Sequence, residues 1–323
     1  MEEAEVSTQV ALRADAFYAN YYGHPIDDLV LLHAHIRRNH AAKAEDGIVW
    51  LAGDSSFDSK HWLSSPFGKL MRSYEALSSK DIARLPRAYE GVFAHPRLAV
   101  CDVAYWVNHH LECAASPLVA LNCAVEEATL RRSASALSKH DMLVRSCIRS
   151  NDVLVVSAGG NDVLLAPSVR TLLTVAVLNF LVPTFLVERD LVPSVLLGGL
   201  RAIFKDQMTQ YLRALCDITL PRLVIVCMCY YPCVHADAES PSWADRFLEG
   251  VGYSRSPAHL QRLIDMMFAR LTCDIAIEGT RVVPLALSTL LDCNDAADYV
   301  QRVEPSCAGG AKMAWRIAEL ALE

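Results

Sequence analysis

The sequence predicts an α/β protein in which a parallel sheet of about five strands is covered by helices on both faces. Three observations predict this class. Four unbroken apolar runs alternate along the chain with segments whose apolar residues recur at helical spacing, and strands buried on both faces read as such runs. The 323 residues are 53% hydrophobic, enough for a substantial core. No repeat, low-complexity tract or linker divides the chain.

The first expected elements are helical. Residues 8–42 carry a helical pattern, and the stretch DDLVLLHAHIRRNH (27–40) opens on an aspartate that we expect to cap its helix. We therefore predict an N-terminal helical extension over residues 1–44 and an α/β domain over residues 45–323.

The apolar runs follow and read as buried strands. They are GIVWLAG (47–53), PLVALNC (117–123), DVLVVSAGG (152–160) and RLVIVCMCYY (222–231). A fifth run, TRVVPLALS (280–288), contains Pro284, a residue confined to edge strands and strand ends. Amphipathic stretches between and after these runs are expected to be helices: LSKHDMLVRSCIRS, RAIFKDQMTQYLRALC, HLQRLIDMMFARLTC and GGAKMAWRIAELALE.

An apolar insertion follows the third run, at about residues 166–204. Its most apolar stretch, TLLTVAVLNFLVPTFLV (171–187), has 17 residues and contains Asn179 and Pro183, so it falls short of a membrane-spanning helix. We predict no transmembrane span. We expect buried helices over the sheet, or an apolar lid or surface at 171–204 that meets a membrane surface or a partner protein.

Composition and cysteine spacing argue against several classes of protein. A net charge of −7 argues against a nucleic-acid partner, because phosphate binding needs clustered Lys and Arg. The acidic N-terminus lacks a secretory signal and the eleven cysteines are scattered, so we expect an intracellular, cytoplasmic protein with free thiols that is not secreted. Cys227 and Cys229 fall on one face of the expected strand, near Cys233. We expect no metal and no cofactor, because zinc-ligand spacing is absent.

Polar motifs end three of the expected strands. GDS (53–55) ends the first, NCA (122–124) ends the second, and GGND (159–162) ends the third. The carboxyl ends of parallel strands are where such sheets bind ligands. We therefore expect Ser55, Ala124 and Asn161 to share one cleft.

In this order and spacing, the three motifs resemble those of the SGNH (GDSL-type) hydrolase superfamily, over roughly residues 45–322. The resemblance implies a flavodoxin-like three-layer sandwich and a serine-dependent ester or acyl hydrolase with Ser55 as nucleophile. It also implies an oxyanion hole made by the backbone N–H of Ser55, a backbone N–H at Ala124 and the Asn161 side chain. Gly160 would let the backbone approach the reacting carbonyl.

The last motif of that family, Asp-x-x-His-Pro followed by a glycine, is changed here. Aligning EPSCAGGAKMA by its proline and glycine puts Glu304 at the histidine position and Gln301 at the aspartate position, with Asp298 three residues too early. Glu304 would serve as base only if burial raised its pKa. His235, which follows the fourth strand with Asp237 close by, is the second candidate base.

Two functions therefore stay open. The first is a hydrolase acting through Ser55 on a small acyl ester or a lipid-like substrate. The second is a catalytically silent member of the same fold that serves as a structural or binding subunit of a larger assembly. Nucleotide binding is disfavoured, because the glycine-rich turns lack the full dinucleotide fingerprint.

Overall fold

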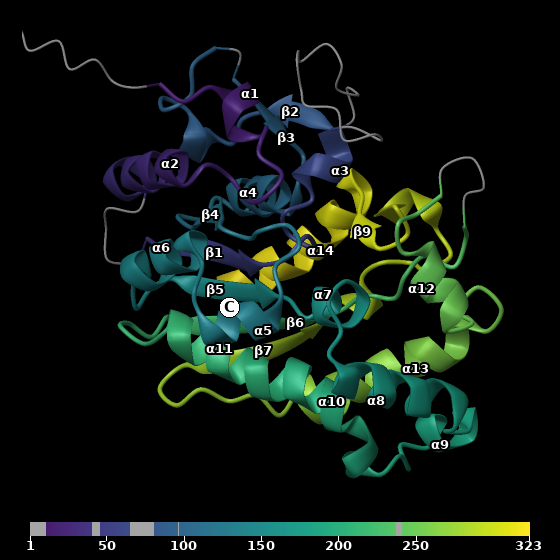
Figure 1. The fold of residues 1–323 in the computed structure, drawn as a ribbon. Helices are drawn as coiled ribbons and strands as arrows, with labels where there is room; N and C mark the ends of the chain where they lie inside the picture. Colours follow the sequence, from purple (N-terminus) through teal and green to yellow (C-terminus); the bar gives the residue numbers. More distant parts are fainter. Residues whose placement is uncertain (1–10, 41–45, 65–80, 96, 237–240) are drawn as a thin grey trace, which may run out of the picture.

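A five-stranded parallel sheet forms the centre of the protein (Figure 1). The structure is a computed structural model and describes residues 11–40, 46–64, 81–95, 97–236 and 241–323. The strands are β1 (Ile48–Gly53), β4 (Val119–Asn122), β5 (Val153–Ser157), β6 (Leu223–Met228) and β7 (Arg281–Ala286). They lie in the order β4-β1-β5-β6-β7 with parallel pairing throughout. Counted along the chain this order is 2-1-3-4-5, the flavodoxin-like arrangement.

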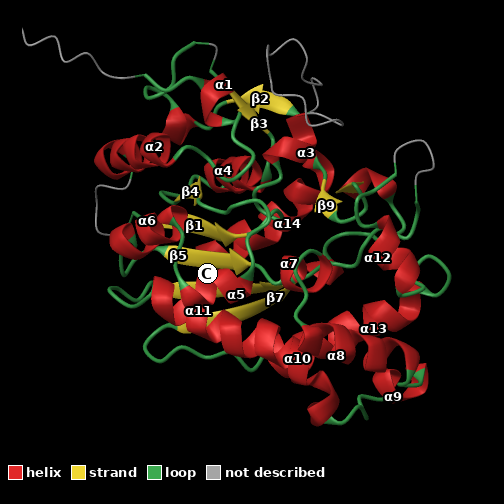
Figure 2. Ribbon diagram, in the orientation of Figure 1, coloured by secondary structure: helices red, strands yellow, loops and turns green. Residues whose placement is uncertain are grey.

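Helices cover both faces of this sheet (Figure 2). They are α1 (Ala14–Phe17), α2 (Ile26–Asn39), α3 (Lys60–Ser64), α4 (Val103–Cys113), α5 (Leu130–Ser135), α6 (Lys139–Cys147), α7 (Gly160–Leu164), α8 (Val169–Phe180), α9 (Thr184–Glu188), α10 (Gly198–Arg201), α11 (Met208–Leu215), α12 (Asp245–Gly250), α13 (Pro257–Met267) and α14 (Cys307–Leu322). A π-helical segment, Ala202–Gln207, joins α10 to α11. The predicted α/β class is confirmed.

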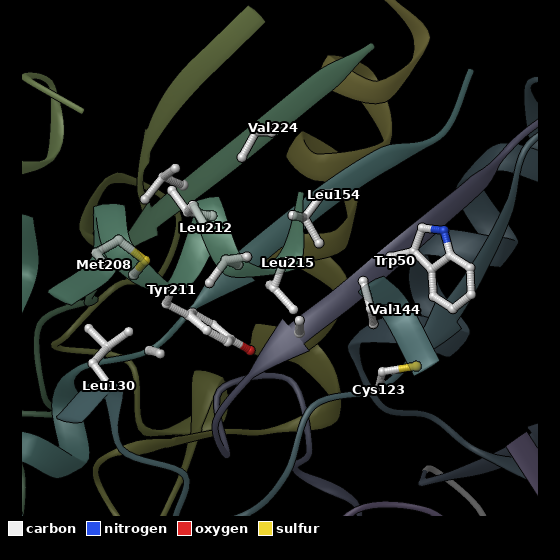
Figure 3. Packing of buried hydrophobic residues seen from close by; sticks show 14 of the residues in the cluster. Trp50, Cys123, Leu130, Val144, Leu154, Met208, Tyr211, Leu212, Leu215 and Val224 are labelled. Carbon is white, nitrogen blue, oxygen red and sulfur yellow. The ribbon is translucent and has the colours of Figure 1, made fainter. Parts of the chain in front are cut away.

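The two faces of each strand belong to two separate cores, because side chains alternate along a strand. In β1, Val49 and Leu51 pack with α4 and α14, whereas Trp50 packs with α2, α6 and α11 on the other face. Figure 3 shows Leu212 and Leu215 of α11 beside side chains of the central strands. This double burial explains why the strands read as unbroken apolar runs.

Two local expectations were wrong. Helix α2 begins at Ile26 behind Pro25, so Asp27 lies inside the first turn and makes no capping hydrogen bond; there its charge still favours the positive end of the helix dipole. Cys229 packs in the opposite core from Cys227, because β6 ends at Met228 and strand alternation ends with it.

Pro284 lies inside β7, opposite Val226 of β6. β7 is at the edge of the sheet and pairs only with β6. Because no strand lies on its other side, the N–H that proline lacks is not needed there for a hydrogen bond. Two short antiparallel pairs, which the sequence did not indicate, accompany the main sheet: β2 (Ile82–Arg84) with β3 (Leu98–Val100), and β8 (Tyr299–Val300) with β9 (Glu304–Pro305).

The insertion comprises α8, α9, a 3₁₀ turn at Ser194–Leu197, and α10. Some of its apolar side chains are buried, some are partly buried, and a third set is more than half exposed. The exposed set is Val169, Leu172, Leu173, Phe180, Leu181, Phe185, Leu191 and Val195. Within the described part of the chain, no helix has both the length and the apolar character to cross a membrane. A membrane-surface or protein partner for 171–204 stays a prediction.

The N-terminal helices share the core of the sheet through a buried carboxylate. Asp152, which precedes β5 and is fully buried, forms an ion pair with Arg37 of α2. The same carboxylate accepts the backbone N–H of Ile48 and the indole N–H of Trp50, each at 2.8 Å, and the N–H of Arg149 at 2.9 Å. One side chain therefore ties α2, β1 and β5 together.

Removing this carboxylate should strongly destabilise the protein. We expect Asp152→Ala to lower the free energy of unfolding by about 3–5 kcal/mol, because it leaves the Arg37 charge and several N–H groups buried without a partner. Asp217→Ala, which breaks an exposed pair with Arg145, is the control and should cost less than about 1 kcal/mol. Urea unfolding measures both, and equal losses would contradict the role given to Asp152.

Candidate active site

The end of β1 is held unusually close to the end of β5. Gly53 has φ +123°, and a Cβ at this position would lie 1.8 Å from the carbonyl oxygen of Ser157. Only glycine fits this approach. The next N–H, of Asp54, then donates to the same Ser157 oxygen at 2.9 Å, and the chain turns within one residue to present Ser55.

The polar turn after β5 presents Asn161. Gly159 adopts φ +115° just before α7. Asp162 accepts the N–H groups of Leu130 and Arg131 at 2.6 and 3.1 Å, which fixes α7 against the first turn of α5. The Asn161 Nδ2 donates to the carbonyl of Ala128 at 3.0 Å. A side-chain amide carries two N–H groups, so this bond orients the second one.

A hairpin brings in the third polar residue. Glu304 starts β9, which pairs with β8 so that Val300 lies opposite Glu304. Between them, Gln301 and Arg302 have φ of 55° and 64°, the left-handed region that costs about 1 kcal/mol for such residues. The Arg302 guanidinium holds the turn through the carbonyl of Cys233 at 3.0 Å and the Asp245 carboxylate at 2.7 Å.

These residues meet in one chamber. Its polar lining comes from the carboxyl ends of β1 and β5 and from β9, and includes Asp54, Ser55, Ser56, Ser157, Asn161 and Glu304. Gly160 also lines it, and a Cβ there would meet no atom within 4 Å. The rest of the wall is mainly apolar and comes from helices, with Val175 and Leu178 of α8, Leu200 of α10, Phe204, and Leu263 and Met267 of α13. The chamber has a volume of about 150 Å³.

Burial dominates the chemistry of Glu304, whose side chain is only 1% exposed. Burial raises its pKa to about 8, while the nearby Ser55 hydroxyl acts in the opposite direction by favouring the charged form. The Trp243 indole lies near enough to favour that form too, yet neither its Nε1 nor Oε2 of Glu304 has a hydrogen-bond partner of normal geometry among the described residues.

Other buried carboxyl groups lie near Glu304. Burial raises the pKa of Asp54 to about 6. Burial, and then the neighbouring Glu304, raise the pKa of Glu126 far above its usual range. Asp58 forms a fully buried ion pair with Lys60 and accepts the N–H groups of Gly23 and Glu126 at 2.8 Å each. Burial at this site therefore favours neutral carboxyl groups, and the chamber lining includes no lysine or arginine.

Two predicted residues do not join the chamber. Ala124 is fully buried outside its lining, and its N–H donates to Asn122 Oδ1 at 3.1 Å, because the Asn122 side chain turns back at the end of β4. His235 is exposed and is not part of the lining, and Asp237, which the sequence placed beside it, lies outside the described residues. Of the candidates, Ser55, Gly160, Asn161 and Glu304 come together.

Gln301 does not orient Glu304 as an aspartate of the family motif would. Its side-chain oxygen accepts the backbone N–H of Trp243 at 3.2 Å, and its carbonyl accepts the Ser242 hydroxyl. Asp298 pairs with Lys312 at 2.6 Å instead of approaching the chamber. Gln301 thus positions the segment that carries Trp243.

Sequence reasoning missed Glu126, Trp243 and the α13 side of the chamber. Glu126 lies two residues after NCA, so the second motif did carry a signal for it. Trp243 and the α13 residues lie far along the chain from every strand-end motif, and no spacing pattern marks them. In the described part of the chain, no three His, Cys, Asp or Glu side chains are arranged to hold a metal ion.

Comparisons with known proteins add little. No protein-family model matches the sequence, and no curated protein matches it. Among solved structures the chain is similar to Est24, a carbohydrate acetylesterase from Sinorhizobium meliloti, with a TM-score of 0.42 and 9% identity over 86% of this chain and 99% of that chain. The site is therefore interpreted from this chain's own residues.

Replacing Glu304 by glutamine should change how stability depends on pH. Between the unfolded pKa, near 4.5, and the folded value of about 8, the folded protein holds a proton that the unfolded chain has released. Stability should therefore fall as pH rises through this window, by up to about 1.4 kcal/mol per pH unit. Glu304→Gln removes this contribution. The Tm of the variant minus the Tm of the wild type should therefore increase from pH 5 to pH 8.

The matched control is Glu249→Gln, which changes an exposed glutamate of α12. Its Tm should follow that of the wild type at every pH. A Tm difference between Glu304→Gln and wild type that stays constant from pH 5 to pH 8 would show that Glu304 titrates normally.

Proposed function

We propose that the protein is a serine-dependent ester hydrolase, with Ser55 as nucleophile and Glu304 as general base. One observation carries the proposal: the Ser55 hydroxyl, the Asn161 amide and the buried Glu304 carboxyl line the same chamber, and Ser55 lies close enough to that carboxyl to favour its charged form. Nucleophile, oxyanion donor and base are the three requirements of acyl transfer through serine.

The first half of the reaction forms an acyl-enzyme. Ser55 Oγ bonds to the ester carbon while its proton passes to Glu304, and the carbonyl oxygen takes up negative charge. The free N–H of Asn161 and the backbone N–H of Ser55 stabilise that charge. The bond to the alcohol then breaks, and the alcohol leaves with the proton from Glu304.

The second half returns the enzyme to its starting state. A water molecule attacks the acyl carbon and gives its proton to Glu304. The bond between the acyl carbon and Ser55 Oγ breaks, the carboxylic acid leaves, and Glu304 returns the proton to Ser55. No other reactant is needed.

Burial is what makes a carboxylate workable as this base. An ordinary glutamate, with a pKa near 4.3, accepts a serine proton poorly. In its buried position Glu304 has a pKa of about 8, which is closer to the value of an efficient base at neutral or mildly alkaline pH. The same shift keeps Glu304 largely protonated, and so inactive, below pH 7.

A catalytically silent binding protein is the second candidate. Two observations favour it: the Ala124 N–H is engaged by Asn122, and the lining of the chamber includes no histidine. Such a protein would bind its ligand in the chamber without cleaving it.

Ser55 decides between the two functions. We expect a fluorophosphonate probe to label the wild type at Ser55, and Ser55→Ala to lose both the label and all turnover of acyl esters. His235→Ala should keep full activity, because His235 lies outside the chamber lining. If the folded wild type is neither labelled nor active, the silent binding protein is the correct assignment.

The pH dependence of the reaction tests Glu304. We expect kcat/KM to rise with pH and to level off above about pH 8, because only ionised Glu304 takes the Ser55 proton. Glu304→Gln should abolish turnover at every pH. A profile that instead levels off near pH 6.5, or an active Glu304→Gln variant, would assign the base to another residue.

A further inference from the structure

The chamber separates its polar residues from its apolar residues by element. The strand ends, the first residues of α7 and β9 supply the groups that the proposed reaction uses. The insertion, the π-helical segment, α12 and α13 supply mainly Val, Leu, Ile, Phe and Met, with Asn179 of α8 as a polar exception. Pockets with this division bind an apolar group and orient it through a few polar contacts.

The size of the chamber bounds the apolar group. Its volume of about 150 Å³ equals that of an apolar protein cavity that holds benzene, a ring of six carbons. An acetyl group would leave most of this volume empty. A chain of roughly six to ten carbons would fill it, while a much longer chain would have to leave through the opening.

The charged groups that line the chamber limit the charge that the polar end of the ligand can carry. Asp54 and Glu304 are the acidic side chains in the lining, and the lining includes no lysine or arginine. A fatty-acid carboxylate would therefore lose its hydration here without a cation to pair with, whereas a neutral ester would not. The same cost favours release of the acid once it ionises.

The geometry points to a medium-chain acyl ester, of roughly six to ten acyl carbons, as the substrate class, with the acyl chain held between α8, α10 and α13. This inference rests on the proposed function, because it places the ester carbonyl at Ser55. It makes Val175 of α8 and Leu263 of α13 residues that determine specificity.

A chain-length series tests the substrate class. With p-nitrophenyl esters from acetyl to palmitoyl, kcat/KM should rise by up to about fourfold for each added methylene until the chamber is full. It should then fall for lauroyl and palmitoyl esters. A wild type that prefers acetyl over hexanoyl and octanoyl would overturn the inference.

A pair of variants on one helix tests the chamber wall. Val175→Trp places an indole in the chamber, so it should lower the ratio of kcat/KM for the octanoyl ester to kcat/KM for the acetyl ester at least tenfold. Val177→Trp is the matched control, because Val177 is a partly buried valine of the same helix that does not line the chamber. Equal chain-length profiles for the two variants would contradict the placement of the chain.

A binding measurement separates this inference from the proposed function. Methyl octanoate should raise the Tm of Ser55→Ala, which cannot cleave it, and methyl acetate at the same concentration should not. Binding of the octanoyl ester by a wild type that shows no turnover would support the acyl chamber and reject the hydrolase. Turnover without any preference for medium chains would support the hydrolase and reject the acyl chamber.

Discussion

The close approach of Gly53 to the Ser157 carbonyl is the constraint on which the site depends. No side chain fits between these two backbones, and the hydrogen bond from Asp54 to the same carbonyl continues the contact past the last strand residue. Because the contact locks the ends of β1 and β5 together, the turns that follow must open onto the same space. Ser55 and Asn161 share a chamber for this reason, although they are far apart in sequence.

The same low-polarity surroundings set the chemistry, the specificity and the stability of the site. In the proposed hydrolase, the burial that raises the pKa of Glu304 would turn a weak base into a usable one, and the apolar wall of the same chamber would hold the acyl chain. The cost is a folded state that is weakened whenever Glu304 ionises. The hairpin that Arg302 holds keeps the carboxyl group in place despite that cost.

Most of the fold could be predicted from the sequence. The errors concern features that depend on exact element boundaries or on contacts between side chain and backbone. Double burial forces long apolar runs, so the five strands were found close to their observed positions. The helix start at Ile26 and the opposite faces of Cys227 and Cys229 depend on single-residue boundaries, which periodicity does not resolve. The Ala124 N–H was expected to be free, but Asn122, the last residue of its own strand, takes it up.

By itself the sequence determined the parallel sheet, its helical layers and the three strand-end motifs, because hydrophobic periodicity and glycine-rich turns act over short stretches of chain. It also placed Glu304 as the candidate base, through the proline and glycines around it. Only the tertiary structure decided that Glu304 is buried against Ser55, that His235 stays outside, and that α8 and α13 wall the chamber. Those outcomes depend on desolvation and on packing between distant segments, and neither leaves a pattern in the local sequence.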